Sequence, residues 1–211
     1  MEPSEPIRPP RLTPDGWESI SRARQQAADL AGAFQRERMM LSISHGRRTL
    51  EVTRDEPDPA LAGPSGCPPG DGAAAILLAT EPFARDLTPR ARVVAWTETG
   101  VDPASPALPL AALIRTTAAR AACPMASFDQ VEIHESTASL IPELLMKLPE
   151  MDPDRINPRG GALALGHPMG ATGTRMVVSL LHRLEDEDQH LGLVALNTPD
   201  GQGLCLILER L

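Results

Sequence analysis

The segment at residues 160–175 reads GGALALGHPMGATGTR and joins a short apolar run to an amphipathic helical pattern. It holds five glycines, one proline and one histidine in sixteen positions. Gly166 and Gly170 permit backbone angles closed to other residues and allow a ligand to approach closely. The helix expected from Ala171 directs its free N–H groups and positive end at His167, which disfavours the imidazolium form. A neutral imidazole there can donate a hydrogen bond to a developing oxyanion.

From these residues alone, His167 has two interpretations. It is either an oxyanion donor held beside a helix terminus or an incidental histidine in a tight strand-to-helix turn, because glycine-rich turns are common. The segment contains neither G-x-x-x-x-G-K-[ST] nor G-x-G-x-x-G, so it predicts no phosphate-binding loop of those kinds. Both interpretations stay open at this point.

A second candidate lies at residues 132–138, which read EIHESTA. His134 and Glu135 come at the end of a predicted strand, just before a predicted helix, and ligands bind at strand ends in α/β sheets. His134 is therefore a candidate acid/base or second oxyanion donor. The alternative is ordinary helix-capping chemistry. Two histidines are too few to argue for a metal site, so none is predicted.

Strand-like and helix-like patterns alternate after residues 54–72, a stretch with five prolines and four glycines. The predicted strands are 73–80, 91–100, 128–134, 190–198 and 203–211, the last two forming a hairpin through PDGQ. The predicted helices are 81–87, 106–122, 137–148 and 171–187, and 160–165 is a short apolar strand or loop. This alternation predicts a layered α/β domain.

The N-terminal part predicts less regular structure. Residues 1–16 carry five prolines and are expected to be irregular. A helix is predicted to follow, capped at Ser19 or Ser21, and residues 39–53 are expected to form a hairpin.

Composition excludes several classes of partner. The chain has two Trp, three Phe, no Tyr and a formal charge of −8, without a Lys/Arg cluster that could track a phosphate backbone, so nucleic acid is not expected. No secretory signal or apolar run of transmembrane length is present, so no membrane partner is expected. Three widely spaced cysteines are typical of a reduced, cytoplasmic protein.

Taken together, these stretches resemble the thiolase family. NPRGGALALGHPMGATGTR (157–175) is similar to the thiolase pattern N-x-x-G-G-A-x-A-x-G-H-P-x-G-A-x-G, and EIHESTA resembles the family's [NH]-E-A-F-A motif. Residues 71–103 are similar to the strand–helix–strand unit that opens the C-terminal half, and 21–39 to a helix of the loop domain. The resemblance covers residues 11–211, about half of a full-length thiolase.

The resemblance implies one βαβαβαββ half of a thiolase-like layered α/β fold, with a mixed sheet and helices. Three regions are expected: the proline-rich irregular segment at 1–16 and, from the resemblance, a partial loop-domain-like region at 17–70 and a C-terminal-like domain at 71–211. Thiolases condense or cleave acyl-CoA thioesters. Coenzyme A is thus implied as a substrate, and no tightly bound cofactor is implied.

Residue roles also follow from the resemblance. His167 matches the GHP histidine, which helps activate the nucleophilic cysteine and donates to an oxyanion, and His134 matches a position that supports the same oxyanion hole. Gly166, Gly170 and Gly201 are expected to shape the loops and the oxyanion sites. Ser65-Gly66-Cys67 is an imperfect match to the CoA-contacting N-A-S, so Ser65 and Cys67 are candidate CoA-binding residues.

The chain also departs from the family pattern. The nucleophilic cysteine belongs to the N-terminal half, which this sequence does not contain. In the C-terminal hairpin motif C-x-G, Asn197 stands at the acid/base cysteine and Pro199 at the glycine. Asparagine cannot titrate and proline has no N–H, and one lost oxyanion donor is worth on the order of 3 kcal/mol.

Two functions are therefore expected. The first is a thiolase-type acyl-CoA acyltransferase that is not competent alone. The alternative is a non-catalytic thiolase-like subunit or scaffold. In both, the face left by the missing half is expected to bind a thiolase-like partner chain or a second copy.

Overall fold

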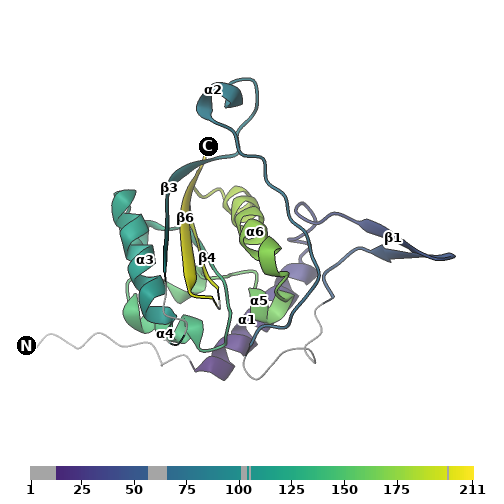
Figure 1. The fold of residues 1–211 in the computed structure, drawn as a ribbon, viewed down its shortest axis with the longest axis horizontal. Helices are drawn as coiled ribbons and strands as arrows, with labels where there is room; N and C mark the ends of the chain where they lie inside the picture. Colours follow the sequence, from purple (N-terminus) through teal and green to yellow (C-terminus); the bar gives the residue numbers. More distant parts are fainter. Residues whose placement is uncertain (1–12, 57–65, 101–103, 105, 199) are drawn as a thin grey trace, which may run out of the picture.

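The computed structural model describes residues 13–56, 66–100, 104, 106–198 and 200–211 (Figure 1). The helices are α1 (Pro14–Leu30), α2 (Glu81–Ala84), α3 (Ala107–Arg120), α4 (Leu140–Lys147), α5 (Ala162–Leu165) and α6 (Thr172–Asp186). The strands are β1 (Leu41–His45), β2 (Arg48–Val52), β3 (Ala91–Gly100), β4 (Gln130–Ile133), β5 (Leu191–Asn197) and β6 (Gln202–Arg210). Short 3-10 turns occupy Met125–Ser127, Pro153–Arg155 and Met169–Ala171.

The main sheet is mixed and has the strand order β3-β6-β5-β4. Strands β5 and β6 form the predicted antiparallel hairpin, β3 pairs with β6 antiparallel, and β4 pairs with β5 parallel. Alternate residues of a strand face opposite sides, so Leu193 and Ala195 face one layer and Val194 the other. The predicted α/β class with a mixed sheet is confirmed.

Helices cover both faces of this sheet (Figure 1). Helices α3 and α4 pack on one face around Leu110, Ile114 and Leu144, and Trp17 of α1 joins the same core. Helix α6 packs on the other face through Met176 and Leu180. Within the described residues, no helix has the length and apolar composition that a membrane crossing requires.

Helix α1 begins earlier than the sequence patterns predicted. It starts at Pro14, and the side chain of Thr13 accepts a hydrogen bond of 3.1 Å from the backbone N–H of Gly16. Proline is favoured in the first helical turn because its missing N–H has no helical partner there. The cap is therefore Thr13 and not Ser19 or Ser21, and residues 14–16 are helical rather than irregular.

Two other local predictions are wrong. Residues 160–165 contain helix α5 instead of a strand or loop. Residues 73–80, predicted as a buried strand, belong to no strand, and their apolar side chains are mostly exposed. The reason is that, among the described residues, no strand pairs with the backbone of this segment.

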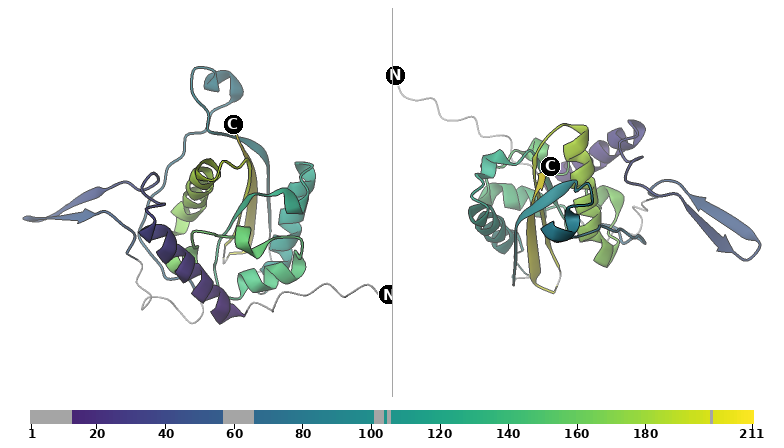
Figure 2. Two further views of the ribbon diagram at one scale, coloured as in Figure 1. Left: turned by 180° about the vertical axis from the view of Figure 1, so that it is seen from behind. Right: turned by 90° about the horizontal axis from the view of Figure 1, so that it is seen from above.

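The predicted hairpin at 39–53 is present as β1 and β2, and Leu41 pairs with Val52. It projects from the body of the molecule (Figures 1 and 2). Gly46 has φ +63°, a left-handed conformation that suits glycine at the turn.

Candidate active site

Two histidine rings meet at the end of the sheet. The ring centroids of His134 and His167 are 4.4 Å apart, with an angle of 35° between the ring planes. His134 follows β4 directly, and His167 lies in the turn before α6. The structure thus brings together the two histidines that the sequence motifs singled out.

Backbone and side-chain hydrogen bonds fix both rings. The N–H of His134 donates to the carbonyl of Ala195 at 3.0 Å, extending the β4–β5 pairing by one residue. The N–H of His167 donates to the carbonyl of Pro68 at 2.8 Å. Nδ1 of His167 lies 2.7 Å from Oγ1 of Thr172, the first residue of α6. The two histidines are therefore held by strand β5, by the first residue of α6 and by the loop that contains Pro68.

Both histidines are held in the neutral form. Burial, followed by the neighbouring His167 and Arg175, lowers the pKa of His134 to about 3. Burial, followed by Arg175, also lowers the pKa of His167. Nδ1 of His134 is buried and has no hydrogen-bond partner within the described residues. A buried polar atom of this kind is satisfied when a bound group pairs with it.

Glu135 is a fully buried carboxylate that ties the site to distant segments. It accepts hydrogen bonds from Nε1 of Trp17 at 2.9 Å and Oγ of Ser21 at 2.8 Å. It also accepts from Nδ2 of Asn157 at 2.9 Å and the N–H of Leu163 at 3.1 Å. Charge-assisted hydrogen bonds of this kind are strong. Through these hydrogen bonds Glu135 holds helices α1 and α5 next to the two histidines.

Asn157 and Gly161 are site residues whose roles the sequence patterns missed. The side chain of Asn157 bonds both backbone groups of Ile133, accepting from N–H and donating to the carbonyl, each at 2.8 Å. A Cβ on Gly161 would lie 2.5 Å from the carboxyl carbon of Glu135. Both residues lie in the quoted NPRGG stretch, but their role depends on contacts across the fold.

Glu132 of β4 is a second buried carboxylate. It lies on the opposite side of the chain from Glu135, near helix α6. Burial raises its pKa to about 7, although the positive charge of Arg175 acts in the other direction. The nearest approach is 3.9 Å, from Nη1 of Arg175 to Oε2 of Glu132. Arg175 therefore acts electrostatically on this carboxyl group and on both histidines.

The glycine candidates differ in their geometry. Gly166 has φ +89° and Gly201 has φ +81°, so both adopt backbone angles that other residues rarely adopt. Gly170 has no positive φ, and a Cβ there would have no heavy atom within 4 Å. The structure thus gives Gly166 and Gly201, but not Gly170, a conformational need for glycine.

The structure describes only some of the residues that depart from the family pattern or are candidate CoA-binding residues. Asn197 ends β5, and its buried Oδ1 has no hydrogen-bond partner within the described residues. Cys67 is half-buried, and its N–H donates to the carbonyl of Ser136 at 3.4 Å. Burial, followed by the charge of Glu135, raises the pKa of the Cys67 thiol. Ser65 and Pro199 lie outside the described residues.

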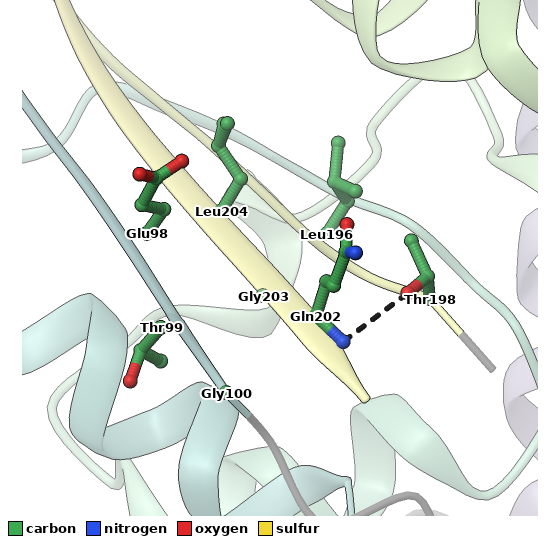
Figure 3. A pocket seen from close by; sticks show the side chains of 8 residues that line it. All are labelled: Glu98, Thr99, Gly100, Leu196, Thr198, Gln202, Gly203 and Leu204. Carbon is green, nitrogen blue, oxygen red and sulfur yellow. Dashed lines mark hydrogen bonds between the residues drawn. The ribbon is translucent and has the colours of Figure 1, made fainter. Parts of the chain in front are cut away.

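A pocket opens at the end of the β3–β6–β5 sheet, separate from the two histidines (Figure 3). Its lining comes from the three strands and the residue after β5: Glu98, Thr99, Gly100, Leu196, Thr198, Gln202, Gly203 and Leu204. The N–H of Gln202 donates to Oγ1 of Thr198 at 3.2 Å and closes the hairpin. Among the residues that the structure describes, no group of three His, Cys, Asp or Glu side chains could hold a metal ion.

Comparison with known proteins identifies the family. Residues 87–210 match the family model described as Thiolase, C-terminal domain. The β-ketoadipyl-CoA thiolase of Pseudomonas putida is 32% identical over 222 residues, covering 95% of this chain and 56% of that protein. The cytosolic acetyl-CoA acetyltransferase of Rattus norvegicus is 32% identical, covering 90% of this chain and 54% of that protein.

A solved structure agrees with this result. The acetyl-CoA acetyltransferase of Bacillus anthracis superposes with a TM-score of 0.88 at 26% identity, covering 96% of this chain and 56% of that chain. The predicted thiolase-like layered fold is confirmed. The chain spans about half the length of the relatives that it matches.

Proposed function

This chain belongs to the thiolase family, and from that premise we propose that it supplies the oxyanion-donor half of an acyl-CoA acyltransferase site. The observation that carries the proposal is the contact between two neutral histidine rings at the end of the sheet. A neutral imidazole carries one ring N–H, which donates a hydrogen bond to an oxyanion. The chemistry is acyl transfer through a thioester.

The proposed role of His167 depends on its tautomer. If the hydroxyl of Thr172 donates to Nδ1 of His167, the ring proton lies on Nε2. The Nε2–H group then donates to the carbonyl oxygen of a thioester as negative charge develops there. His134, in van der Waals reach of the first ring, fixes the orientation of His167 and offers its own ring nitrogens.

Two features support dependence on a further polypeptide segment. Asn197 cannot remove a proton from an attacking acetyl group. The Cys67 thiol has a raised pKa, which is the opposite of what a nucleophilic cysteine needs. We therefore propose that the nucleophile and the base come from a thiolase-like partner, and that Cys67 serves at most as a contact for coenzyme A.

The alternative function is a non-catalytic thiolase-like subunit. The observation that favours it is Asn197, because its buried side chain replaces the titratable group at the end of β5. In this alternative the histidine pair and the Glu135 network preserve the fold, and the protein acts by binding an active thiolase.

An activity assay tests the proposal. The chain is co-expressed with the N-terminal part of the B. anthracis enzyme, and CoA-dependent thiolysis of acetoacetyl-CoA is measured. We expect no turnover by the chain alone and turnover by the pair that falls about 100-fold in the His167→Ala variant. His190→Ala, a change of an exposed histidine outside the site, is the control.

Two results would contradict it. Turnover by the chain alone would show that Asn197 does not abolish the chemistry. Absence of turnover with the partner, together with no CoA binding by calorimetry, would favour the non-catalytic subunit.

A further inference from the structure

The buried carboxyl group of Glu132 lies on the same face of the sheet as the ring of His134. Side chains two residues apart point to the same face of a strand, and the N–H of His134 continues the pairing of β4 with β5. Glu132 pairs with Val194, whose side chain belongs to the cluster packed under α6. Helix α6 contacts β4 on this face (Figure 1). Both side chains therefore face α6.

Arg175 of α6 acts on the histidine pair and on Glu132 at the same time. It comes one helical turn after Thr172, the residue whose hydroxyl lies 2.7 Å from Nδ1 of His167, and residues at this spacing are neighbours on one helix face. After burial, the positive charge of Arg175 is a further cause of the lowered pKa of both histidines. The same charge opposes the effect of burial on the pKa of Glu132. One guanidinium thus serves two sites.

The contact between Arg175 and Glu132 is an incomplete ion pair. Nη1 of Arg175 lies 3.9 Å from Oε2 of Glu132, which is beyond hydrogen-bond distance, although the Glu132 side chain is only 4% exposed. Oε2 of Glu132 and Nε of Arg175 are buried and have no hydrogen-bond partner within the described residues. A shift of about 1 Å would bring the two groups to hydrogen-bond distance. The pair therefore has bonding capacity that this arrangement leaves unused.

The charged groups around Glu132 come from three parts of the fold. Burial is the largest cause of its altered pKa and raises it to about 7, while Arg175 and, more weakly, Arg183 of α6 lower it. Glu37, in the segment after α1, and Glu135, just after β4, raise it further. Glu37 is also buried in part and lies in the field of Arg175. Glu132 thus changes its charge near neutral pH, whereas the guanidinium of Arg175 keeps its charge.

We propose that Arg175 is a positioning residue whose guanidinium moves between Glu132 and the histidine pair according to the proton on Glu132. When Glu132 holds its proton, the carboxyl group is neutral and the charge of Arg175 stays beside the histidines, where it adds to the stabilisation of an oxyanion. When Glu132 loses its proton, the carboxylate closes the 3.9 Å gap and draws the charge of Arg175 away. The effect on acyl transfer rests on the function proposed above, but the link between Glu132 and the histidines is a property of the chain alone.

NMR of the chain alone tests this link without catalysis. The full isotope-labelled chain is titrated from about pH 5 to about pH 9, and the ring nitrogens of His134 and His167 are followed together with the carboxyl carbon of Glu132. We expect Glu132 to titrate at about pH 7. The nitrogens of both neutral rings should shift slightly with the same midpoint, because the charge of Arg175 leaves them. Protonation of the His167 ring itself is a separate, larger change at lower pH.

Variants of the charged residues assign the shared midpoint. Glu132→Gln and Arg175→Gln should each abolish the histidine shift, whereas Arg175→Lys, which keeps the positive charge, should retain it. Glu37→Gln removes a charge that raises the pKa of Glu132, so the shift should persist with its midpoint at lower pH. A purely structural role of Glu132 would not move this midpoint. Glu150→Gln, which changes an exposed carboxylate 2.9 Å from Arg115, is the control and should leave the shift unchanged.

The chain reconstituted with the N-terminal part of the B. anthracis enzyme tests the effect on the reaction. Thiolysis of acetoacetyl-CoA is measured at about pH 6 and about pH 8 for the unmodified chain and for Glu132→Gln. We expect the two kcat/KM values to be equal at the lower pH, where Glu132 holds its proton in the unmodified chain. At the higher pH the value for Glu132→Gln should be about threefold larger, because Arg175 stays beside the histidines in the variant.

Each outcome supports or overturns the inference. Histidine nitrogens that show no shift at the midpoint of Glu132 overturn it, and this result needs no variant. A shift that persists in Glu132→Gln, or a ratio of kcat/KM values that does not change with pH, also overturns it. A shared midpoint in the chain alone, without turnover by the reconstituted pair, supports this inference and contradicts only the proposed function.

Discussion

Strand β4 and residues 73–80 show opposite relations between sequence and burial. Strand β4 reads QVEI, half of it polar, yet all four residues are buried. Residues 73–80 read AAAILLAT, almost entirely apolar, yet most are exposed. The difference is the surroundings: β4 pairs with β5 and is covered by helices, while no strand in the described part of the chain pairs with residues 73–80. Burial is decided by available neighbours, and not by the hydrophobicity of the segment alone.

The largest expected effect tests this contrast directly with two leucines. Leu144, fully buried on α4, and Leu77, 83% exposed, are each changed to Ala. We expect Leu144→Ala to lower the free energy of unfolding by about 4 kcal/mol and Leu77→Ala by less than about 0.5 kcal/mol. Urea denaturation of the isolated chain measures both. Equal losses would show that residues 73–80 are already packed in solution.

The next effect uses two buried titratable groups, Glu132 in β4 and His134 directly after it. The raised pKa of Glu132, about 7, favours the folded state below pH 4.5, and this contribution is lost as the pH rises through 7. The lowered pKa of His134, about 3, acts in the opposite direction: its contribution is present above pH 6.5 and is lost as the pH falls. Between pH 4.5 and 6.5, the Glu132 contribution to the free energy of unfolding falls with pH while the His134 contribution rises.

Two variants separate these slopes. In Glu132→Gln, stability should rise more steeply with pH over this window than in the unmodified chain, because only the His134 contribution remains. In His134→Asn, stability should fall as the pH rises from 4.5 to 7, by about 3 kcal/mol. Urea denaturation at several pH values measures both, and parallel profiles in the two variants would refute the assignment.

Two glycines of the 160–175 segment, one on each side of helix α5, give a smaller effect of the same kind. Gly161→Ala places a Cβ against the carboxyl of Glu135, whose other contacts prevent it from moving, and should destabilise the fold by about 2 kcal/mol. Gly170→Ala places its Cβ in open space and should be neutral or slightly stabilising. Thermal unfolding of the two variants suffices, and a larger loss for Gly170→Ala would show that this loop packs differently.

The smallest effect concerns the charge beside the histidines. Arg175→Gln removes a positive charge that lowers the pKa of both His134 and His167, so each pKa should rise. The rise should be modest because burial is the larger cause for both. Arg90→Gln is the control: it should raise the pKa of His182 and leave His167 unchanged. NMR titration of the ring nitrogens measures the pKa values of all three histidines. An unchanged pKa of His167 in Arg175→Gln would exclude an influence of Arg175.

Several secondary-structure elements and the histidine pair could be predicted from the sequence. The hairpin of β5 and β6 and helix α6 have strong local periodicity, and the motifs placed His134 and His167 correctly at the sheet end. Helix α5 was missed because GGALAL carries no clear period over so few residues. The start of α1 is not predicted because Pro14 falls among the prolines of residues 1–16, which favour irregular structure, whereas it is a first-turn proline of the helix.

The supporting network of the site could not be predicted in the same way. Trp17 and Glu135 are 118 residues apart in the chain, and no local pattern reports that they touch. The steric need for glycine at position 161 likewise appears only when Glu135 and Asn157 are in place. Such contacts are properties of the assembled fold, and a single sequence does not display them.

The bond between Trp17 and Glu135 has a consequence for biosynthesis. Helix α1 leaves the ribosome before the carboxylate on which it docks, because Glu135 is made 118 residues after Trp17. At about 5–20 residues per second, the apolar face of α1 waits roughly ten seconds for its binding site. During this interval the apolar face of α1 is exposed on the nascent chain, and transiently exposed apolar surface of this kind promotes aggregation.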